Sequence, residues 1–274
     1  MRDIENYVLQ LSIRGGLGNQ LFQLCGAITL ARKLQARLQV NETALKRHKD
    51  PSRQNWVNHL DLTNLIGNTK INWVNNKRIK LFKTRTFFNQ IEEIDIVKLT
   101  KLETNLAFRG WFQDKQFVEG LKLNKNSLRP KGITTNFPLP NNSMTSNKDV
   151  GAIHMRLGDF HGTSWGVLPI SWYGKIFEEL NTLGDFHIHI YSDDIKGANE
   201  ITQMLSPKFE FSFPERDRKL PPHELLWALR NYNTFVSSNS SLSWWASYLN
   251  TTENPRIYSA WSEHLHISPW IKVS

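Results

Sequence analysis

The stretch Tyr7-Val8-Leu9-Gln10-Leu11-Ser12-Ile13-Arg14-Gly15-Gly16-Leu17-Gly18-Asn19-Gln20 places a strand, a glycine-rich turn and the start of a helix in direct succession. Apolar residues alternate as far as Ile13, which predicts a strand over 7–13. From Leu21 onward, apolar residues recur at the three- and four-residue spacing of a helix. A strand that passes through such a turn into a helix is typical of an α/β protein.

The second half of the chain repeats this alternation. Strands are predicted at 150–155, 186–191, 209–213, 234–237 and 256–258, and helices at 171–183, 195–205, 221–230 and 242–249. Strands that alternate with helices form parallel sheets. We therefore predict an α/β fold of two Rossmann-like lobes with an interdomain cleft.

The domain boundary is predicted at a stretch rich in Pro and Asn. Residues 130–148 have the composition of a linker, so the expected domains are 1–148 and 149–274. In the first domain a short strand is predicted at 38–40. The polar, Asn-rich residues 41–105 are expected to form helices and loops.

Composition limits the possible classes of protein. The chain has 274 residues, with 34 Lys and Arg against 25 Asp and Glu, a net charge of +9. No apolar run approaches the roughly 18–20 residues of a membrane span, and the single Cys25 excludes a disulfide framework or a Cys-based zinc site. The N-terminus carries no hydrophobic signal core, which predicts a cytoplasmic protein. The charge favours anionic partners, although scattered basic residues also suit a solvated surface.

Four polar clusters follow predicted strands, and ligands of open α/β sheets bind beyond such strand ends. The first cluster contains Gly16, Gly18, Asn19 and Gln20. Glycines let a ligand approach the backbone closely, and the amides of a helix N-terminus attract anions. The same residues also suit a tight strand-to-helix turn without a ligand.

The second cluster is His154-Met155-Arg156-Leu157-Gly158-Asp159. The strand period places His154 and Arg156 on one face, and an arginine fork at a strand end can bind a phosphate in two-pronged fashion. Asp159 can orient that arginine or accept a proton as a general base. A purely structural Arg–Asp pair is the alternative.

The remaining two clusters also have two interpretations. In the run Ser192-Asp193-Asp194, a carboxylate can accept from guanine N–H groups or ribose hydroxyls, and the Asp193-Asp194 pair can hold a divalent metal. Alternatively, Ser192 or Asp193 caps the next helix. The run Asn239-Ser240-Ser241 stands ahead of a helix, where it can cradle an anion or act as an N-cap.

Five segments together resemble the α-1,2-fucosyltransferases of glycosyltransferase family 11. They are residues 15–23, 110–113 (Gly-Trp-Phe-Gln), 154–160, 191–194 and 239–249, in the order of the family and spread over nearly the whole chain. The chain departs from the family's His-x-Arg-Arg-Gly-Asp pattern at Leu157. Arg156 is therefore the only arginine of that motif here.

The resemblance implies a GT-B-like, inverting enzyme that moves fucose from GDP-fucose to the 2-hydroxyl of a galactoside and needs no metal or other cofactor. It implies that 1–148 is the acceptor-side domain and 149–274 the GDP-sugar-binding domain. Arg156 is expected to hold the β-phosphate, with His154 and Asp193 near guanine. The resemblance also places Asn239, Ser240 and Ser241 near the diphosphate, and Gly16, Gly18 and Asn19 near the phosphate–fucose junction. The predicted catalytic residues are Arg156, Asp159 and Asn19. The predicted donor-binding residues are Gly16, Gly18, Asn19, Gln20, His154, Arg156, Ser192, Asp193, Asn239, Ser240 and Ser241.

Several alternatives remain open from the sequence. The same scaffold can use another GDP-sugar such as GDP-mannose, or the chain can be a non-catalytic nucleotide- or carbohydrate-binding protein. An RNA binder would suit the charge, but no recognised RNA-binding signature is present. The expected partners are GDP-fucose and a galactose-terminated oligosaccharide, without nucleic acid. The expected localisation is cytoplasmic, with peripheral association at the inner face of an anionic membrane as a further hypothesis.

Overall fold

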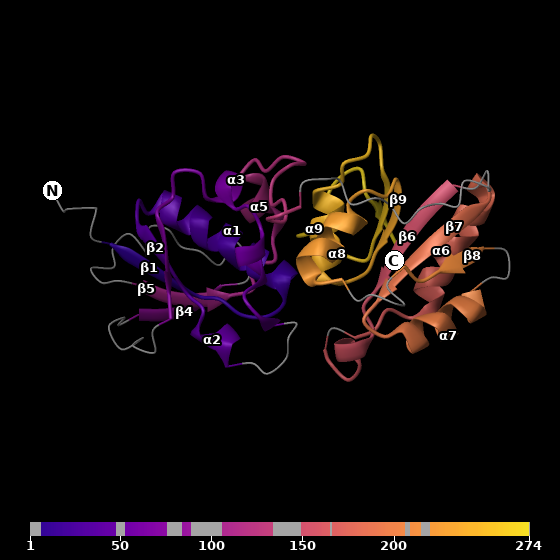
Figure 1. The fold of residues 1–274 in the computed structure, drawn as a ribbon, viewed down its shortest axis with the longest axis horizontal. Helices are drawn as coiled ribbons and strands as arrows, with labels where there is room; N and C mark the ends of the chain where they lie inside the picture. Colours follow the sequence, from indigo (N-terminus) through magenta and orange to yellow (C-terminus); the bar gives the residue numbers. More distant parts are fainter. Residues whose placement is uncertain are drawn as a thin grey trace. The chain divides into compact units, whose positions relative to one another are not determined.

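The computed structural model describes residues 7–47, 53–75, 84–88, 106–133, 149–164, 166–205, 209–214 and 220–273, with the backbone alone at 84–88. The chain forms two compact units, 1–132 and 133–274, each built on its own parallel sheet (Figure 1). The predicted domain boundary at 148 and most of the predicted linker lie outside the described residues. Pro130, at the start of that linker, is buried and pairs with Leu60 in the first unit.

The first unit contains a five-stranded parallel sheet. Its strands are β1 (Val8–Ser12), β2 (Arg37–Asn41), β3 (Ile71–Val74), β4 (Thr84–Phe88) and β5 (Leu106–Gly110). They lie in the order β3-β2-β1-β5-β4. The predicted strands at 7–13 and 38–40 are confirmed. The expectation of helices and loops alone over 41–105 is wrong, because β3 and β4 lie there.

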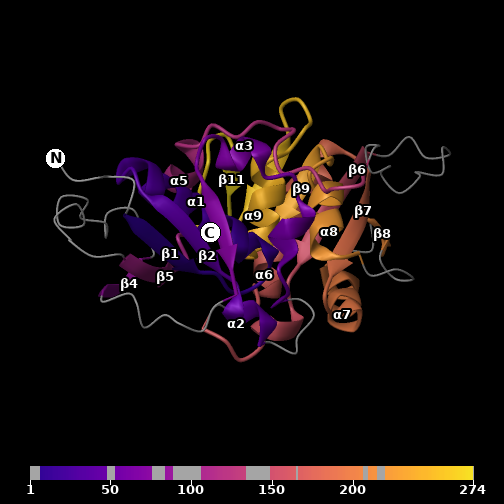
Figure 2. The same cartoon turned by 60° about the vertical axis from the view of Figure 1, so that its left-hand side comes forward.

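Helix α1 (Leu17–Lys33) packs beside β1 and β2, with α5 (Lys115–Glu119) next to it (Figures 1 and 2). Most of α1 is buried, and it ends with Arg32 and Lys33, whose charges favour a helix C-terminus. Close packing explains Gly26: a Cβ there would lie 2.3 Å from the ring of Phe112. The unit also contains the short α2 (Thr43–Lys46), η3 (Trp56–His59) and α3 (Thr63–Ile66).

The second unit contains a six-stranded parallel sheet. Its strands are β6 (Asp149–Met155), β7 (Phe186–Ser192), β8 (Glu210–Ser212), β9 (Thr234–Ser237), β10 (Arg256–Ser259) and β11 (Ile271–Lys272). They lie in the order β11-β10-β9-β6-β7-β8. All five strands predicted in this half are confirmed, but the predicted last strand, β10, is followed by β11.

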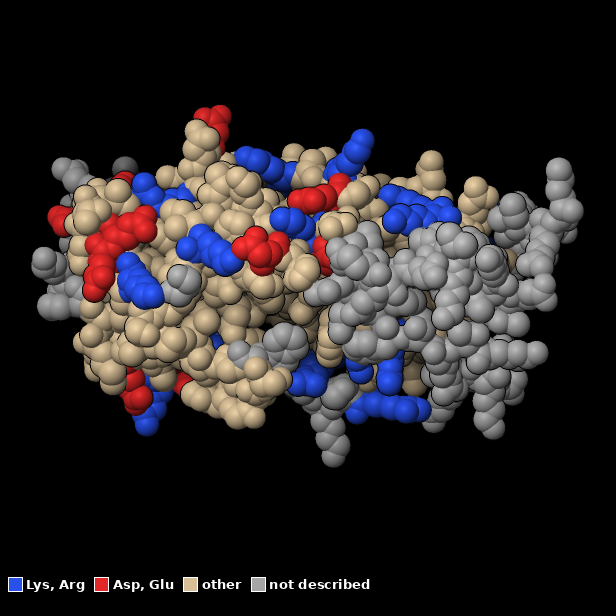
Figure 3. Space-filling view, turned by 180° about the vertical axis from the view of Figure 1, so that it is seen from behind, with Lys and Arg blue, Asp and Glu red and all other residues tan. Residues whose placement is uncertain are grey.

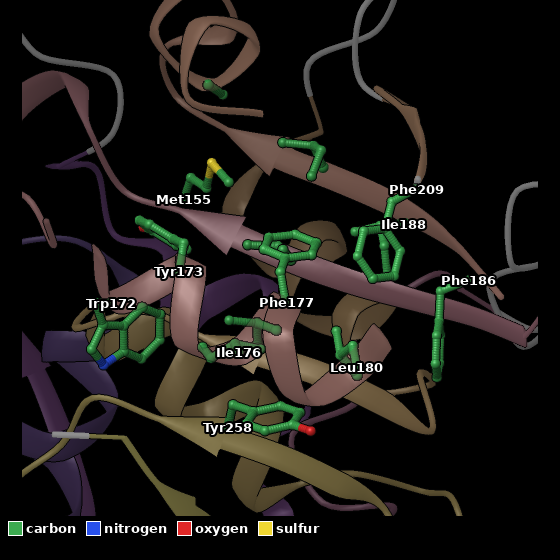
Figure 4. Close-up of a cluster of buried hydrophobic side chains, with 14 of the residues drawn as sticks. Met155, Trp172, Tyr173, Ile176, Phe177, Leu180, Phe186, Ile188, Phe209 and Tyr258 are labelled. Carbon is green, nitrogen blue, oxygen red and sulfur yellow. The ribbon is translucent and has the colours of Figure 1, made fainter. Parts of the chain in front are cut away.

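The helices of the second unit are η6 (Gly158–Phe160), α6 (Ile170–Leu183), α7 (Ile195–Leu205), α8 (Pro222–Leu229) and α9 (Ser241–Tyr248). The four predicted helices agree with α6, α7, α8 and α9. Figure 4 shows the rings of Tyr173 and Phe177 on α6 turned toward Met155 and Ile188 of the sheet. This apolar layer fixes the sheet against α6. Within the described residues, no helix has the length and apolar character needed to cross a bilayer.

The first strand of each unit, β1 or β6, lies inside its sheet, and the next two strands extend to one side of it. In the second unit the chain then returns to place β9 beside β6 and continues outward to β10, so the connections from β6 and β9 leave in opposite directions. In the first unit the chain returns to β4 at the far edge and then places β5 between β4 and β1. The carboxyl ends of β6 and β9 therefore form a switch point, where ligands are expected, and the carboxyl ends of β1 and β5 are the corresponding strand ends of the first sheet.

Candidate functional site

The arginine that follows β6 is held by two carboxylates. Arg156 Nε lies 2.8 Å from Asp159 Oδ1, and Arg156 Nη1 lies 3.3 Å from Asp193 Oδ2. Asp159 comes from η6, one turn beyond Arg156, and Asp193 follows β7, the neighbouring strand. The structure therefore brings together three of the predicted site residues at one strand end.

These contacts leave part of the guanidinium available. Of its five N–H groups, one on Nε and one on Nη1 face carboxylates. The others, including both on Nη2, have no hydrogen-bond partner among the described residues. With 26% of its side chain exposed, Arg156 is held through Nε and Nη1 and keeps its remaining donors for a ligand.

Asp193 is a positioning group for this arginine. Its Oδ1 accepts from the backbone N–H of Leu157 at 2.9 Å while Oδ2 faces Arg156. Burial would raise the pKa of Asp193, but Arg156 and the N–H groups of Leu157 and Gly158 outweigh burial and lower it. Gly158 is required by this proximity, since a Cβ there would lie 2.8 Å from Asp193 Oδ2.

His154, the last but one residue of β6, is buried and uncharged near neutral pH. Its Nδ1 hydrogen-bonds Ser243 Oγ of α9, and Ser243 Oγ lies 3.2 Å from Ser238 Oγ. Burial, with a further contribution from Arg156, lowers the pKa of His154 to about 4, although Asp193 opposes this. Neutral imidazole keeps both a donor and an acceptor, and Nε2 is the ring nitrogen with no partner among the described residues.

The third predicted cluster starts α7. Ser192 Oγ accepts from Asp194 N at 3.1 Å, and Asp194 Oδ1 accepts from Gly197 N at 3.0 Å. The capping interpretation was made for Ser192 or Asp193, but the side chain that caps α7 is that of Asp194. Ser192 supports the turn before the helix, and Asp193 faces Arg156. Within the part of the chain that the structure describes, no group of three or more His, Cys, Asp or Glu residues could hold a metal ion.

The fourth cluster follows β9 at the switch point. Ser240 is the N-cap of α9 and accepts from Leu242 N at 3.3 Å, and Ser241 is the first helical residue. Asn239 Nδ2 donates to the backbone oxygen of Gly166 at 3.0 Å. The N-cap interpretation holds, and α9 begins just after β9, the strand that pairs with β6, which Arg156 follows.

In the first unit, two buried glutamines of α1 hold the glycine-rich turn. Gln20 Nε2 donates to the backbone oxygens of Gly15 and Gln54, each at 2.7 Å, and its Oε1 accepts from two backbone N–H groups of η3. Gln23 exchanges two hydrogen bonds with the backbone of Arg14. Every hydrogen-bonding position of the Gln20 side chain is thus used by the protein, which makes Gln20 a structural residue of the turn.

Asn19 lies near the carboxyl ends of β1 and β5, where Gln113 Nε2 donates to its Oδ1 at 3.0 Å. Gly15, with φ of 81°, packs so closely that a Cβ would lie 3.3 Å from Asn19 and 3.4 Å from the Trp111 ring. The guanidinium carbon of Arg14 lies 4.6 Å from the centre of that ring. Gly16 and Gly18 belong to the same turn, as the N-cap and second residue of α1.

The loop after β5 has a strained backbone. Phe112 is buried and has a φ of 53°, a left-handed conformation that is uncommon for a bulky residue. Its ring packs edge-on against Phe108 and Phe117. This packing holds Trp111 and Gln113, the residues on either side of Phe112, beside the glycine-rich turn.

Sequence reasoning did not single out the roles of Gln23, Trp111, Gln113 and Ser243. A signal existed for Gln23 and Ser243, because each is a polar residue on an otherwise apolar stretch of helix, where a buried polar group needs a partner. Arg14 also joins the first site, with its pKa lowered by burial and then by the nearby charge of Arg109. The contact between Asn19 and Gln113 spans 94 residues and carried no local signal.

On the face of the second unit seen at the left of Figure 3, basic side chains are interspersed with acidic ones. This pattern is typical of a solvated surface.

Comparisons with known proteins agree with this architecture. No family model matches the chain. The O-antigen biosynthesis glycosyltransferase WbnK of Escherichia coli is 24% identical over 284 residues, which cover 90% of this chain and 92% of WbnK.

Solved structures of fucosyltransferases share the fold. The structure of POFUT1 in complex with GDP matches all of this chain and 99% of its own, with 17% identity and a TM-score of 0.56. The fucosyltransferase NodZ from Bradyrhizobium matches 92% of this chain and 95% of its own, with 13% identity and a TM-score of 0.54. The predicted fold class is confirmed: two parallel-sheet α/β units, like those of GT-B-like fucosyltransferases.

Proposed function

We propose that the chain is a glycosyltransferase that moves fucose from GDP-fucose to the 2-hydroxyl of a galactoside. Similarity to an O-antigen biosynthesis glycosyltransferase along nearly the whole chain supports the reaction class. The fold shared with POFUT1 solved with GDP, and with NodZ, supports a GDP-sugar donor. The five segments that resemble family 11 support the fucose donor and the 2-linkage.

The observation that carries the proposal is the orientation of Arg156. Two carboxylates hold its guanidinium at Nε and Nη1, and further N–H groups remain for a ligand at the strand ends from which α9 begins. A planar guanidinium fixed in this way is suited to a diphosphate oxygen, because it does not have to reorient when negative charge develops on that oxygen. Asp193 is needed for this geometry, so its proposed role is to position Arg156 rather than to contact guanine.

The proposed reaction is a single inverting displacement. The acceptor oxygen attacks C1 of fucose while the bond from C1 to the β-phosphate oxygen breaks, and the bonding electrons leave with GDP. Arg156 and the backbone amides of α9 stabilise the charge on the departing diphosphate. The hydroxyl proton passes to Asp159 as the proposed base. Asn19, Gly16 and Gly18 of the first unit are proposed to lie near the phosphate–fucose junction.

Guanine recognition is proposed for the β6–β7 strand ends. His154 is neutral and offers Nε2, and its other nitrogen is fixed by Ser243. No step of this scheme calls for a metal ion. The reaction is therefore proposed to proceed without one, with charge stabilisation supplied by Arg156.

A product assay tests the proposal. The protein is incubated with GDP-fucose and a panel of β-galactosides, with and without EDTA, and the product linkage is identified by NMR. Fucose on the 2-hydroxyl, formed equally with EDTA, is the expected result. A different linkage would overturn the proposed 2-linkage; an example is an α-1,6 linkage, since NodZ is an α-1,6-fucosyltransferase. Transfer from GDP-mannose alone would overturn the donor, and GDP binding without any transfer would indicate a binding protein.

A further inference from the structure

Beside Asn19, the first unit carries two side chains, Trp111 and Gln113, to which the proposed diphosphate chemistry gives no role. Asn19, Gln113 and Trp111 meet at the carboxyl ends of β1 and β5, where a parallel sheet binds ligands. An amide pair and an indole ring carry no charge to balance a diphosphate and do not accept a proton as a base near neutral pH. Their chemistry therefore points to another kind of ligand.

We propose that Trp111 with the Asn19–Gln113 amide pair forms a subsite for an uncharged pyranose that presents two neighbouring hydroxyls. Gln113 Nε2 donates to Asn19 Oδ1, and this hydrogen bond determines which atoms of the two amides remain for a ligand. The Asn19 Nδ2 donor and the Gln113 Oε1 acceptor have no partner among the described residues. One donor next to one acceptor complements a pair of sugar hydroxyls, each of which can donate and accept.

The acceptor half of this pair selects against an anion. A phosphate at neutral pH mostly accepts, so it would be repelled by Gln113 Oε1, whereas a sugar hydroxyl donates to that oxygen. Trp111 adds an apolar ring face of the kind that packs on the C–H groups of a pyranose. Arg14 lies over that ring and orients it.

The loop conformation is consistent with a preformed site. Phe112 holds a left-handed backbone between the two proposed ligand residues, and strain of this kind persists where packing enforces it, commonly at binding sites. Gly15 leaves the space between Asn19 and Trp111 free of a side chain. The subsite is therefore fixed before any sugar arrives.

This inference rests on the proposed function only where it identifies the bound pyranose as the galactoside acceptor. Binding itself is independent of the donor. The test is saturation-transfer NMR with methyl β-galactopyranoside at about 10 mM, a concentration suited to dissociation constants in the millimolar range. GDP binding is measured in parallel by thermal shift, because failure there would count against the proposed function and not against this subsite.

The decisive variants are Gln113→Leu and Trp111→Ala, with Trp111→Phe in case the alanine variant does not fold. A matched control exists in the same sheet: Gln10 and Gln39 form another amide pair, 3.3 Å apart, in the middle of β1 and β2. Gln39→Leu removes that pair away from the strand ends. It should leave sugar binding within about twofold, whereas Gln113→Leu should weaken it about tenfold.

The expected pattern is saturation transfer to the galactoside in the wild type that falls in the Trp111 and Gln113 variants while GDP binding stays unchanged. Absence of transfer in the wild type would overturn the proposal, as would equal binding in the Gln113→Leu and Gln39→Leu proteins. Displacement of the galactoside by inorganic pyrophosphate in the GDP-free protein would also overturn it, by showing that the site prefers an anion.

Discussion

Replacing Arg156 by lysine keeps the positive charge and removes the fork. The guanidinium uses two different nitrogens, Nε and Nη1, to face Asp159 and Asp193, and still has Nη2 for a ligand. An ammonium carries all its donors on one atom and cannot satisfy both carboxylates while facing a third group. Loss of one preorganised donor to a developing anion costs about 2.7–4 kcal/mol, so kcat should fall about 100- to 1,000-fold.

The assay is GDP release coupled to product formation at saturating donor and acceptor, with thermal unfolding recorded for each variant. Arg156→Ala should be at least as impaired, and it should also raise the pKa of Asp193, because the principal charge that lowers it is gone. Arg256→Ala is the matched control, since Arg256 lies at the amino end of β10 in the same sheet. It should retain turnover within about twofold.

A folded Arg156→Lys protein with kcat within about threefold of the wild type would refute this reasoning. It would show that the departing group is stabilised elsewhere and that the ion pairs of Arg156 serve the fold alone.

Three further predictions concern Asp159, His154 and Gln20. Because Arg156 faces two carboxylates, Asp159→Asn removes one negative charge beside it and should tighten GDP binding several-fold in calorimetry. The same variant should have a lower kcat, because it lacks the proposed base, and an unchanged acidic limb of its pH–rate profile would exclude that role. The pKa of His154 is lowered from 6.5 to about 4, so on acidification the unfolded chain binds the proton before the folded protein does. The free energy of unfolding should therefore fall by about 3 kcal/mol as the pH drops from above 6.5 to below 4. Urea unfolding at pH 7 and 5 should show a smaller loss of this free energy in His154→Gln than in the wild type, and an equal loss would contradict the burial argument. Gln20→Leu leaves four backbone groups without partners and should cost about 3 kcal/mol, measured as a lower urea midpoint than that of Gln39→Leu.

The second unit was largely predictable from the sequence because its strands are apolar and its helices have clear periodicity. Residues 195–205 and 234–237 were predicted with the bounds of α7 and β9. In the first unit β3 was missed, since Ile71–Val74 includes a polar residue and lies at the sheet edge with little burial. Two-residue strands such as β11 are too short to show any period.

The candidate site was predictable where its residues share a motif. Arg156 and Asp159 are three residues apart, so their pairing followed from local sequence. Gln20 was expected to bind the donor, yet its side chain is used by the backbone of the turn and of η3, a role that depends on residues 36 and 37 positions away. Contacts of that length are decided by tertiary packing, which no local pattern reports.

The contact between Gly26 and Phe112 has a consequence for engineering this chain. A methyl group at Gly26 would collide with the Phe112 ring, which holds the loop after β5. Helix α1 and the loop after β5 are therefore packed so closely that a change in one requires a matching change in the other. Grafting that loop from a relative to change sugar preference should succeed only when α1 is transplanted with it, and saturation mutagenesis should find Gly26 intolerant to every larger residue.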